Sequence, residues 1–173
     1  MKTLASFALF AALASVPASA QKLNLNLNFD ALAKNATEKT ELSLEGPLLE
    51  MLRQKLAKAG DQDNKAALLA SIDQVSVHSY EYAKPGDYAD SDLDPLRKQM
   101  ASAAGWSRLL DVKEKDESTQ IYVLMQGDKP AGFLLIAAEP KELTVIHVAG
   151  SIQLAQLKEL VDSTIKFKEL AQE

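Results

Sequence analysis

The sequence predicts a single α+β domain, mainly an antiparallel β-sheet of about five to six strands with helices packed on one face. Four short apolar runs follow one another in the second half of the chain, separated by connectors that contain charged residues, Gly and Pro. They are Trp106–Val112, Ile121–Gln126, Ala131–Ala138 and Leu143–Ala149. Their length and their content of Val, Ile, Leu and aromatic residues predict a C-terminal four-strand meander. Segments with helical spacing lie apart from these runs, which is the pattern of an α+β fold.

Residues 1–20 have the features of a cleaved signal peptide. The apolar run Leu4–Ala14 is much shorter than the roughly 20 residues that a bilayer-spanning helix needs, which disfavours a membrane anchor. Small residues at Ala18-Ser19-Ala20 then form a cleavage motif, so we expect cleavage between Ala20 and Gln21. Residues 21–173 have the size of one domain. We therefore expect an exported protein, periplasmic or extracellular, that does not span a membrane after cleavage.

The remaining elements follow from capping and spacing signals. Pro47 suits the first position of a helix and Gly60 suits its end, while Asp94-Pro95 opens another helix that ends at Gly105. The expected elements before the meander are a short helix from Asp30 to about Thr37, a strand Lys39–Leu44, a helix from Pro47 to Gly60, a helix from Asp61 or Asp63 to Ile72, a strand Val75–Tyr82 and a helix Asp94–Gly105.

The sequence predicts less order at both ends of the mature chain. Leu23–Phe29 alternates between apolar and polar residues, which fits a strand or a loosely paired segment at a fresh N-terminus. Ser151 opens a last helix with apolar residues at helical spacing, and the tail beyond it is polar. We therefore treat residues 21–28 and 168–173 as candidates for disorder.

The strand Val75–Tyr82 divides its side chains between two faces. Val75 and Val77 share one face, which we expect to pack against the helices, whereas His78, Tyr80 and Tyr82 share the other. An antiparallel sheet can leave one face in water, and tyrosine suits partner surfaces because it combines a large apolar area with a polar group. His78, Tyr80, Tyr82 and nearby Tyr88 are therefore candidates for a partner-facing surface. The pattern leaves open whether Tyr80 and Tyr82 are exposed.

Composition excludes several classes of partner and site. The formal net charge is −5 and no run of Lys or Arg occurs, which argues against nucleic acid and anionic lipid surfaces. The chain has no Cys, so it has no disulfide framework, thiolate metal site or thiol nucleophile. It is 47% hydrophobic, which is enough to build a core without such links. Composition does not predict the oligomeric state.

Two groups of residues have side chains that can bind metal ions. Asp90, Asp92 and Asp94 alternate like the opening of a calcium loop, but Pro95 and Ala101 stand where that loop needs Gly and Glu. We interpret this loop, which also contains Asp87, as an acidic cap at a helix N-terminus.

The histidines are the second group. His78 and His147 lie in separate expected strands, and a zinc site needs three or four protein ligands. We expect neither a metal nor another cofactor.

The motifs of common nucleophilic and metal-dependent enzymes are absent. The sequence contains no Gly-x-Ser-x-Gly, no His-Glu-x-x-His and no Gly-rich phosphate loop. We therefore do not expect an enzyme, and we predict no catalytic residue.

Four motifs, in their order and spacing, resemble a known family. They are Ser79-Tyr80-Glu81-Tyr82 followed by Lys84-Pro85-Gly86, Gly105-Trp106-Ser107-Arg108-Leu109, Glu139-Pro140-Lys141-Glu142-Leu143, and Gly150-Ser151-Ile152-Gln153-Leu154. From about Phe29 to Leu160 the chain resembles the bacterial exported domain of unknown function 4252 (DUF4252). The resemblance implies a bacterial, exported, single-domain α+β protein and carries no activity, cofactor or catalytic residue. It also suggests a link with envelope signalling, because genes of the family lie near those of extracytoplasmic sigma factors. The Gln153 position departs from the acidic residue that the family favours, which concerns only a surface cap.

The functional prediction is a non-catalytic binding or interaction module of the cell envelope with a protein partner. The alternative is a carrier of small apolar ligands with a pocket between sheet and helices, and a hydrolase is the third reading. A binding module predicts an exposed apolar patch, and a carrier predicts a pocket of roughly 300 Å³ or more lined by Leu, Ile and Phe. An enzyme predicts clustered titratable groups in a cleft.

Overall fold

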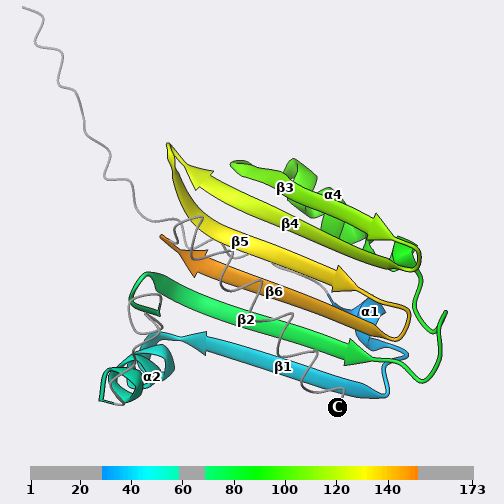
Figure 1. Ribbon diagram of the computed structural model, residues 1–173, viewed down its shortest axis with the longest axis horizontal. Helices are drawn as coiled ribbons and strands as arrows, with labels where there is room; N and C mark the ends of the chain where they lie inside the picture. Colours follow the sequence, from blue (N-terminus) through cyan, green and yellow to red (C-terminus); the bar gives the residue numbers. More distant parts are fainter. Residues whose placement is uncertain (1–28, 59–68, 152–173) are drawn as a thin grey trace, which may run out of the picture.

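The computed structural model describes residues 29–58 and 69–151. Within these residues six strands form one sheet in the order β1-β2-β6-β5-β4-β3, and every neighbouring pair is antiparallel (Figure 1). The strands are β1 (Glu38–Glu45), β2 (Ile72–Glu81), β3 (Trp106–Glu114), β4 (Glu117–Gln126), β5 (Lys129–Ala138) and β6 (Glu142–Gly150). The helices are α1 (Asp30–Ala33), α2 (Gly46–Lys58), the 3₁₀ helix η1 (Asp90–Leu93) and α4 (Asp94–Ser102). The predicted α+β fold is confirmed.

Strands β3 to β6 form the predicted meander. Consecutive strands pair, and tight turns join them at Lys115 and Gly127, whose φ angles are +47° and +60°. Positive φ is the conformation that lets a two-residue turn follow the twist of the strands. The meander is therefore a local structure that the sequence specifies well.

Gly150 lies where β6 approaches the start of β2, the strand with which β6 pairs. A Cβ atom at this position would lie 2.3 Å from the Ser71 carbonyl oxygen and 2.7 Å from Ile72 Cα. The next residue, Ser151, donates its backbone N–H to the same Ser71 oxygen at 2.9 Å. Because β2 thus occupies the free side of β6, the two edges of the sheet are β1 and β3.

One face of the sheet, here called the α4 face, carries the larger core. Its sheet residues include Tyr80, Tyr122, Leu134 and Val145, and they form one cluster with side chains of α1, η1 and α4. The helical members of this cluster are Leu32, Leu93, Leu96 and Met100. All four are buried, so this face is sealed by helices of the described chain.

The opposite face, here called the α2 face, carries a second core. Leu49 of α2 is 1% exposed and clusters with sheet residues that include Val123, Phe133 and Val148. The described helices are therefore divided between two faces, whereas the sequence predicted helices on one face. The reason is visible in β4 and β5, whose Ile121–Leu124 and Phe133–Ile136 stretches are apolar at every position, as in strands buried on both sides.

Several predicted segments lie outside the described residues. They are the signal peptide with its cleavage site at Ala20–Gln21, residues 21–28, most of the helix expected from Asp61 or Asp63, the last helix expected after Ser151, and residues 168–173. Ile72, which the sequence predicts at the end of a helix, instead begins β2. Within the described ranges no helix is long and apolar enough to cross a membrane.

Candidate functional site

Tyr80 and Tyr82 do not form a partner-facing surface. Their side chains are 0% and 4% exposed, and both belong to the core of the α4 face. The Tyr82 hydroxyl donates a hydrogen bond to the Leu32 carbonyl oxygen at 2.8 Å. The expectation that these residues meet a partner is therefore wrong, because the tyrosine face of β2 is the face that α1 and α4 cover.

His78 and Tyr88 lie beside this core and are only partly exposed. The His78 ring stacks on Phe29 with centroids 4.1 Å apart, and Tyr88 stacks on Tyr82 at 4.5 Å. Burial lowers the pKa of His78, and the charge of Glu41 opposes that effect. The four candidate residues thus do lie on one side of the sheet, but they serve its packing.

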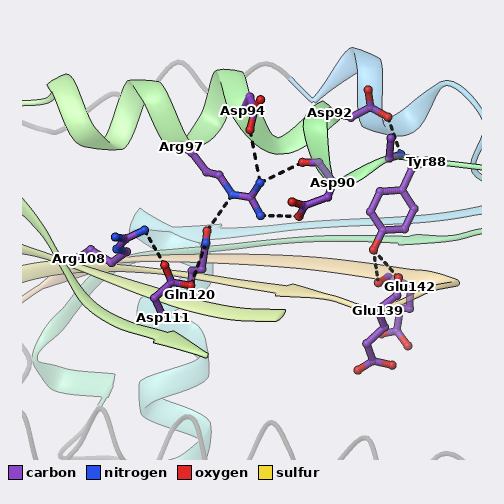
Figure 2. Close-up of polar contacts among 11 residues, drawn as sticks. Tyr88, Asp90, Asp92, Asp94, Arg97, Arg108, Asp111, Gln120, Glu139 and Glu142 are labelled. Carbon is purple, nitrogen blue, oxygen red and sulfur yellow. Dashed lines mark hydrogen bonds and ion pairs between the residues drawn. The ribbon is translucent and has the colours of Figure 1, made fainter. Parts of the chain in front are cut away.

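Tyr88 joins the loop after β2 to the turn between β5 and β6. Its hydroxyl donates to the carbonyl oxygens of Glu139 and Glu142 (Figure 2). Burial raises the pKa of Tyr88 to about 12, with smaller contributions from Asp90 and Glu142, so the hydroxyl remains a donor at neutral pH. This residue acts as a structural link and not as a free contact surface.

The acidic loop uses its carboxylates locally. Asp92 accepts a hydrogen bond from the Ala89 N–H at 2.8 Å, and Asp87 accepts one from the Lys84 N–H at 3.2 Å. Asp90 and Asp94 accept from Arg97 of α4 at 2.6 and 3.5 Å (Figure 2). Over the described ranges no three acidic or histidine side chains are grouped so that they could hold a metal ion. No loop side chain caps the described N-terminus of α4, so the carboxylates instead bind backbone N–H groups of the loop and join the loop to α4 through Arg97.

Arg97 is the centre of a polar chain that reaches the edge strand β3. Its Nε donates to the Gln120 Oε1 at 3.1 Å, and the Gln120 Nε2 donates to Asp111 at 3.2 Å. Asp111 also pairs with Arg108 at 2.6 Å (Figure 2). The hydrogen bond from Arg97 holds the pKa of Asp90 below its usual value. The chain fixes the position of α4 relative to β3 and β4.

We expect Arg97→Met to lower the free energy of unfolding by roughly 1–2 kcal/mol, because Gln120 is 6% exposed and its oxygen would lose its donor. Arg108→Met is the matched control. Arg108 is 54% exposed in its pair with Asp111, so its loss should cost no more than about 0.5 kcal/mol. Urea unfolding of both variants at neutral pH measures the difference. Equal effects would show that the chain through Gln120 contributes nothing to stability.

A groove of about 490 Å³ opens at the turn end of the sheet. It lies between the loop after β2, the β3–β4 turn and the β5–β6 turn. Its polar lining includes Tyr88, Asp90, Lys113, Lys115, Asp116 and Glu117. The carrier alternative requires a pocket lined by Leu, Ile and Phe, and this groove does not have that lining.

Among the described residues seven large apolar side chains are exposed, and β3 carries three of them; the others are Leu42 of β1, Leu48 and Met51 of α2, and Met125 of β4. Every residue from Ser107 to Glu114, here called the β3 edge, is exposed. Leu109, Leu110 and Val112 are 48%, 40% and 39% exposed, and within residues 29–58 and 69–151 no strand pairs with the outer side of β3. On the other edge strand, β1, Leu42 is the corresponding large apolar residue at 45%.

The two faces of the β3 edge differ in chemistry. Leu110 and Val112 pair with Ile121 and Thr119 of β4 and lie on the α2 face. Asp111 pairs with Gln120 and lies on the α4 face, where Lys113 borders the groove. From Leu110 to Lys113 the strand is therefore apolar on the α2 face and charged on the α4 face, while Glu114 follows on the α2 face, and no described strand pairs with its outer backbone groups.

The model of the family described as Domain of unknown function (DUF4252) matches residues 33–160. The chain belongs to this family. No curated protein matches it. The matched range includes all six strands of the DUF4252 sheet, and with them the β3 edge and the groove.

The sequence contained a signal for the DUF4252 edge strand that composition alone did not reveal. In β3 the charged residues Arg108, Asp111 and Lys113 interrupt the apolar ones, whereas β4 and β5 contain uninterrupted apolar stretches. An interrupted pattern is typical of a strand with little cover, and an uninterrupted one of a strand buried on both faces. The contrast between neighbouring strands of the meander would have marked β3 as exposed.

Proposed function

We propose that this protein is a non-catalytic binding module of the bacterial cell envelope, which captures an extended segment of a protein partner as an additional strand on β3. The exposure of the β3 edge carries the proposal. Its placement in the envelope rests on the signal-peptide features of residues 1–20. The link to envelope signalling belongs to the same proposal and rests on the family alone.

Strand addition suits the chemistry of this edge. An edge strand presents unpaired N–H and C=O groups, and a partner strand that binds them gains main-chain hydrogen bonds while side-chain pairs provide specificity. Leu110 and Val112 offer apolar contacts on the α2 face, and Asp111 and Lys113 offer charged contacts on the α4 face. The pairing of β3 with β4 is regular from Leu110 to Glu114, so this stretch is straight enough to template another strand.

The opposite edge is a poorer template. β1 exposes one large apolar side chain, Leu42, where β3 exposes three. The two edges carry similar numbers of charged residues, Glu38, Lys39, Glu41 and Glu45 on β1 and Arg108, Asp111, Lys113 and Glu114 on β3, so they differ in their exposed apolar side chains. The partner is therefore expected at β3.

The sheet provides a matched pair of residues for the test. Leu42 and Leu110 have the same side chain and nearly equal exposure, and they stand at the two ends of one row of paired residues that crosses the α2 face. A photo-reactive amino acid is placed at either position, and the protein is crosslinked in the envelope of its own host. We expect an adduct with another protein from position 110 and none from position 42.

Leu110→Lys should weaken that capture by about tenfold or more, because the partner strand would bury an unpaired charge. Leu42→Lys should leave it unchanged. Both residues are exposed, so each variant should unfold within about 0.5 kcal/mol of the wild type. Equal adducts from the two positions, or equal loss in the two lysine variants, would contradict the proposal.

A further inference from the structure

The straight part of the β3 edge is complementary to itself. Consider two copies of β3 that pair antiparallel and are related by a two-fold axis. Residues directly opposite each other in such a pair lie on the same face of the sheet. With the axis at Val112, Asp111 of one copy lies opposite Lys113 of the other, and Lys113 lies opposite Asp111. These four charged groups are then on the α4 face. On the α2 face the two Val112 side chains meet, and Leu110 of each copy lies opposite Glu114 of the other.

The neighbouring registers lack this complementarity. An axis at Asp111 would place the two Asp111 carboxylates opposite each other. An axis at Lys113 would place the two Lys113 ammonium groups opposite each other. Like charges directly opposite each other destabilise a strand pair, whereas opposite charges stabilise it. A bulge between Arg108 and Leu110 interrupts the regular pairing on the other side. The register at Val112 is therefore the favoured one in the straight segment.

We infer that the β3 edges of two copies of this chain pair antiparallel about a two-fold axis at Val112, so that two six-stranded sheets join into one. The inference rests on the proposed function, since it names a second copy as a partner of the same edge. Self-pairing covers Leu110 and Val112 and satisfies the outer backbone groups of β3. A partner strand must then compete with the second copy for this edge.

The interface is a single pair of short strands, which lies at the small end of specific interfaces. We expect a reversible dimer whose population rises over the range of about 1–500 µM in sedimentation equilibrium of residues 21–173. The assembly should weaken as salt is added, because two of its cross-strand contacts are ionic.

Charge exchange tests the register directly. Asp111→Lys places lysines opposite Lys113 of the other copy, and Lys113→Asp places aspartates opposite Asp111. Each variant alone should remain monomeric over the whole range. An equimolar mixture of the two should dimerise, because each lysine of the first variant then faces an aspartate of the second. Sedimentation of the mixture, with one variant fluorescently labelled, measures this hetero-dimer.

Circular dichroism melting of each variant confirms that a loss of dimer is not a loss of fold, and Leu42→Lys on the opposite edge should dimerise like the wild type.

A wild-type chain that is monomeric at all concentrations overturns the inference. So does a mixture that fails to dimerise while both variants are folded, or a dimer that only Leu42→Lys disrupts. If the chain is monomeric but position 110 still crosslinks to another protein, the proposed function stands without the inference. If it dimerises and position 110 crosslinks only to a second copy, the inference stands and capture of another protein does not.

Discussion

Tyr80→Ala should lower the free energy of unfolding by about 3–5 kcal/mol, because it removes a large, wholly buried side chain from the core of the α4 face. Tyr80 lies opposite Leu143 of β6, and its ring centroid is 6.3 Å from that of Phe29. Replacing both Tyr80 and Tyr82 by Ser, which an exposed pair would tolerate, should leave the chain unfolded at ordinary temperature. Urea unfolding at pH 7 measures the loss. A Tyr80→Ala variant within about 0.5 kcal/mol of the wild type would show that the residue lies on the surface after all.

The two hydroxyl groups give a finer comparison within the same experiment. Among the described residues the Tyr80 hydroxyl has no hydrogen-bond partner, whereas the Tyr82 hydroxyl donates to the Leu32 oxygen. Burial raises the pKa of both groups, that of Tyr80 to about 12. Tyr80→Phe should therefore be neutral or stabilising, and Tyr82→Phe should cost about 1–2 kcal/mol, because it leaves a buried carbonyl oxygen unpaired.

Tyr80 was a partner-facing candidate whose exposure the sequence left open, and its burial shows what the sequence could not specify. Period-two alternation assigns Val77 to one face of β2 and Tyr80 to the other, and the structure has that division. It does not say which face the helices cover, because both faces of β2 carry apolar side chains. That choice depends on where α1 and α4 return to the sheet, which is a long-range property of the chain.

The exposure of the β3 edge could not be predicted from the sequence for the same reason. Local turn signals were enough to predict the meander, and the helix that begins at Asp94 was predicted from its cap. Whether β3 is an edge depends on β6 pairing with β2, more than 60 residues earlier in the chain. Gly150 permits the close approach to Ser71 and Ile72 that this pairing needs, and local turn signals do not encode it. A strand can therefore be predicted from its residues, whereas its exposure follows only from the topology.

The second large effect is a dependence of the free energy of unfolding on pH. His147 is 5% exposed, and burial lowers its pKa to about 4 from 6.5. The folded protein therefore keeps this imidazole neutral at pH values where the unfolded chain binds a proton. Because the unfolded state then carries more protons, stability falls as the pH drops from about 6.5 to about 4, by about 3 kcal/mol in all from this group. Above pH 7 the group contributes no pH dependence.

His147→Leu should remove most of this slope. The imidazole lies 6.2 Å from the Trp106 ring and beside Leu134, so leucine fits the apolar surroundings and does not titrate. His78→Gln is the control: burial lowers the pKa of His78 too, but its side chain is partly exposed, so its removal should flatten the curve less. Asp90 acts in a lower range, because its depressed pKa gives stability that is lost only as the pH falls below about 4. Urea unfolding of the three proteins between pH 8 and pH 4 separates these groups. If His147→Leu retained the full slope, the protonation that destabilises the fold would belong to other residues, and the buried imidazole would not be the acid-sensitive group of this domain.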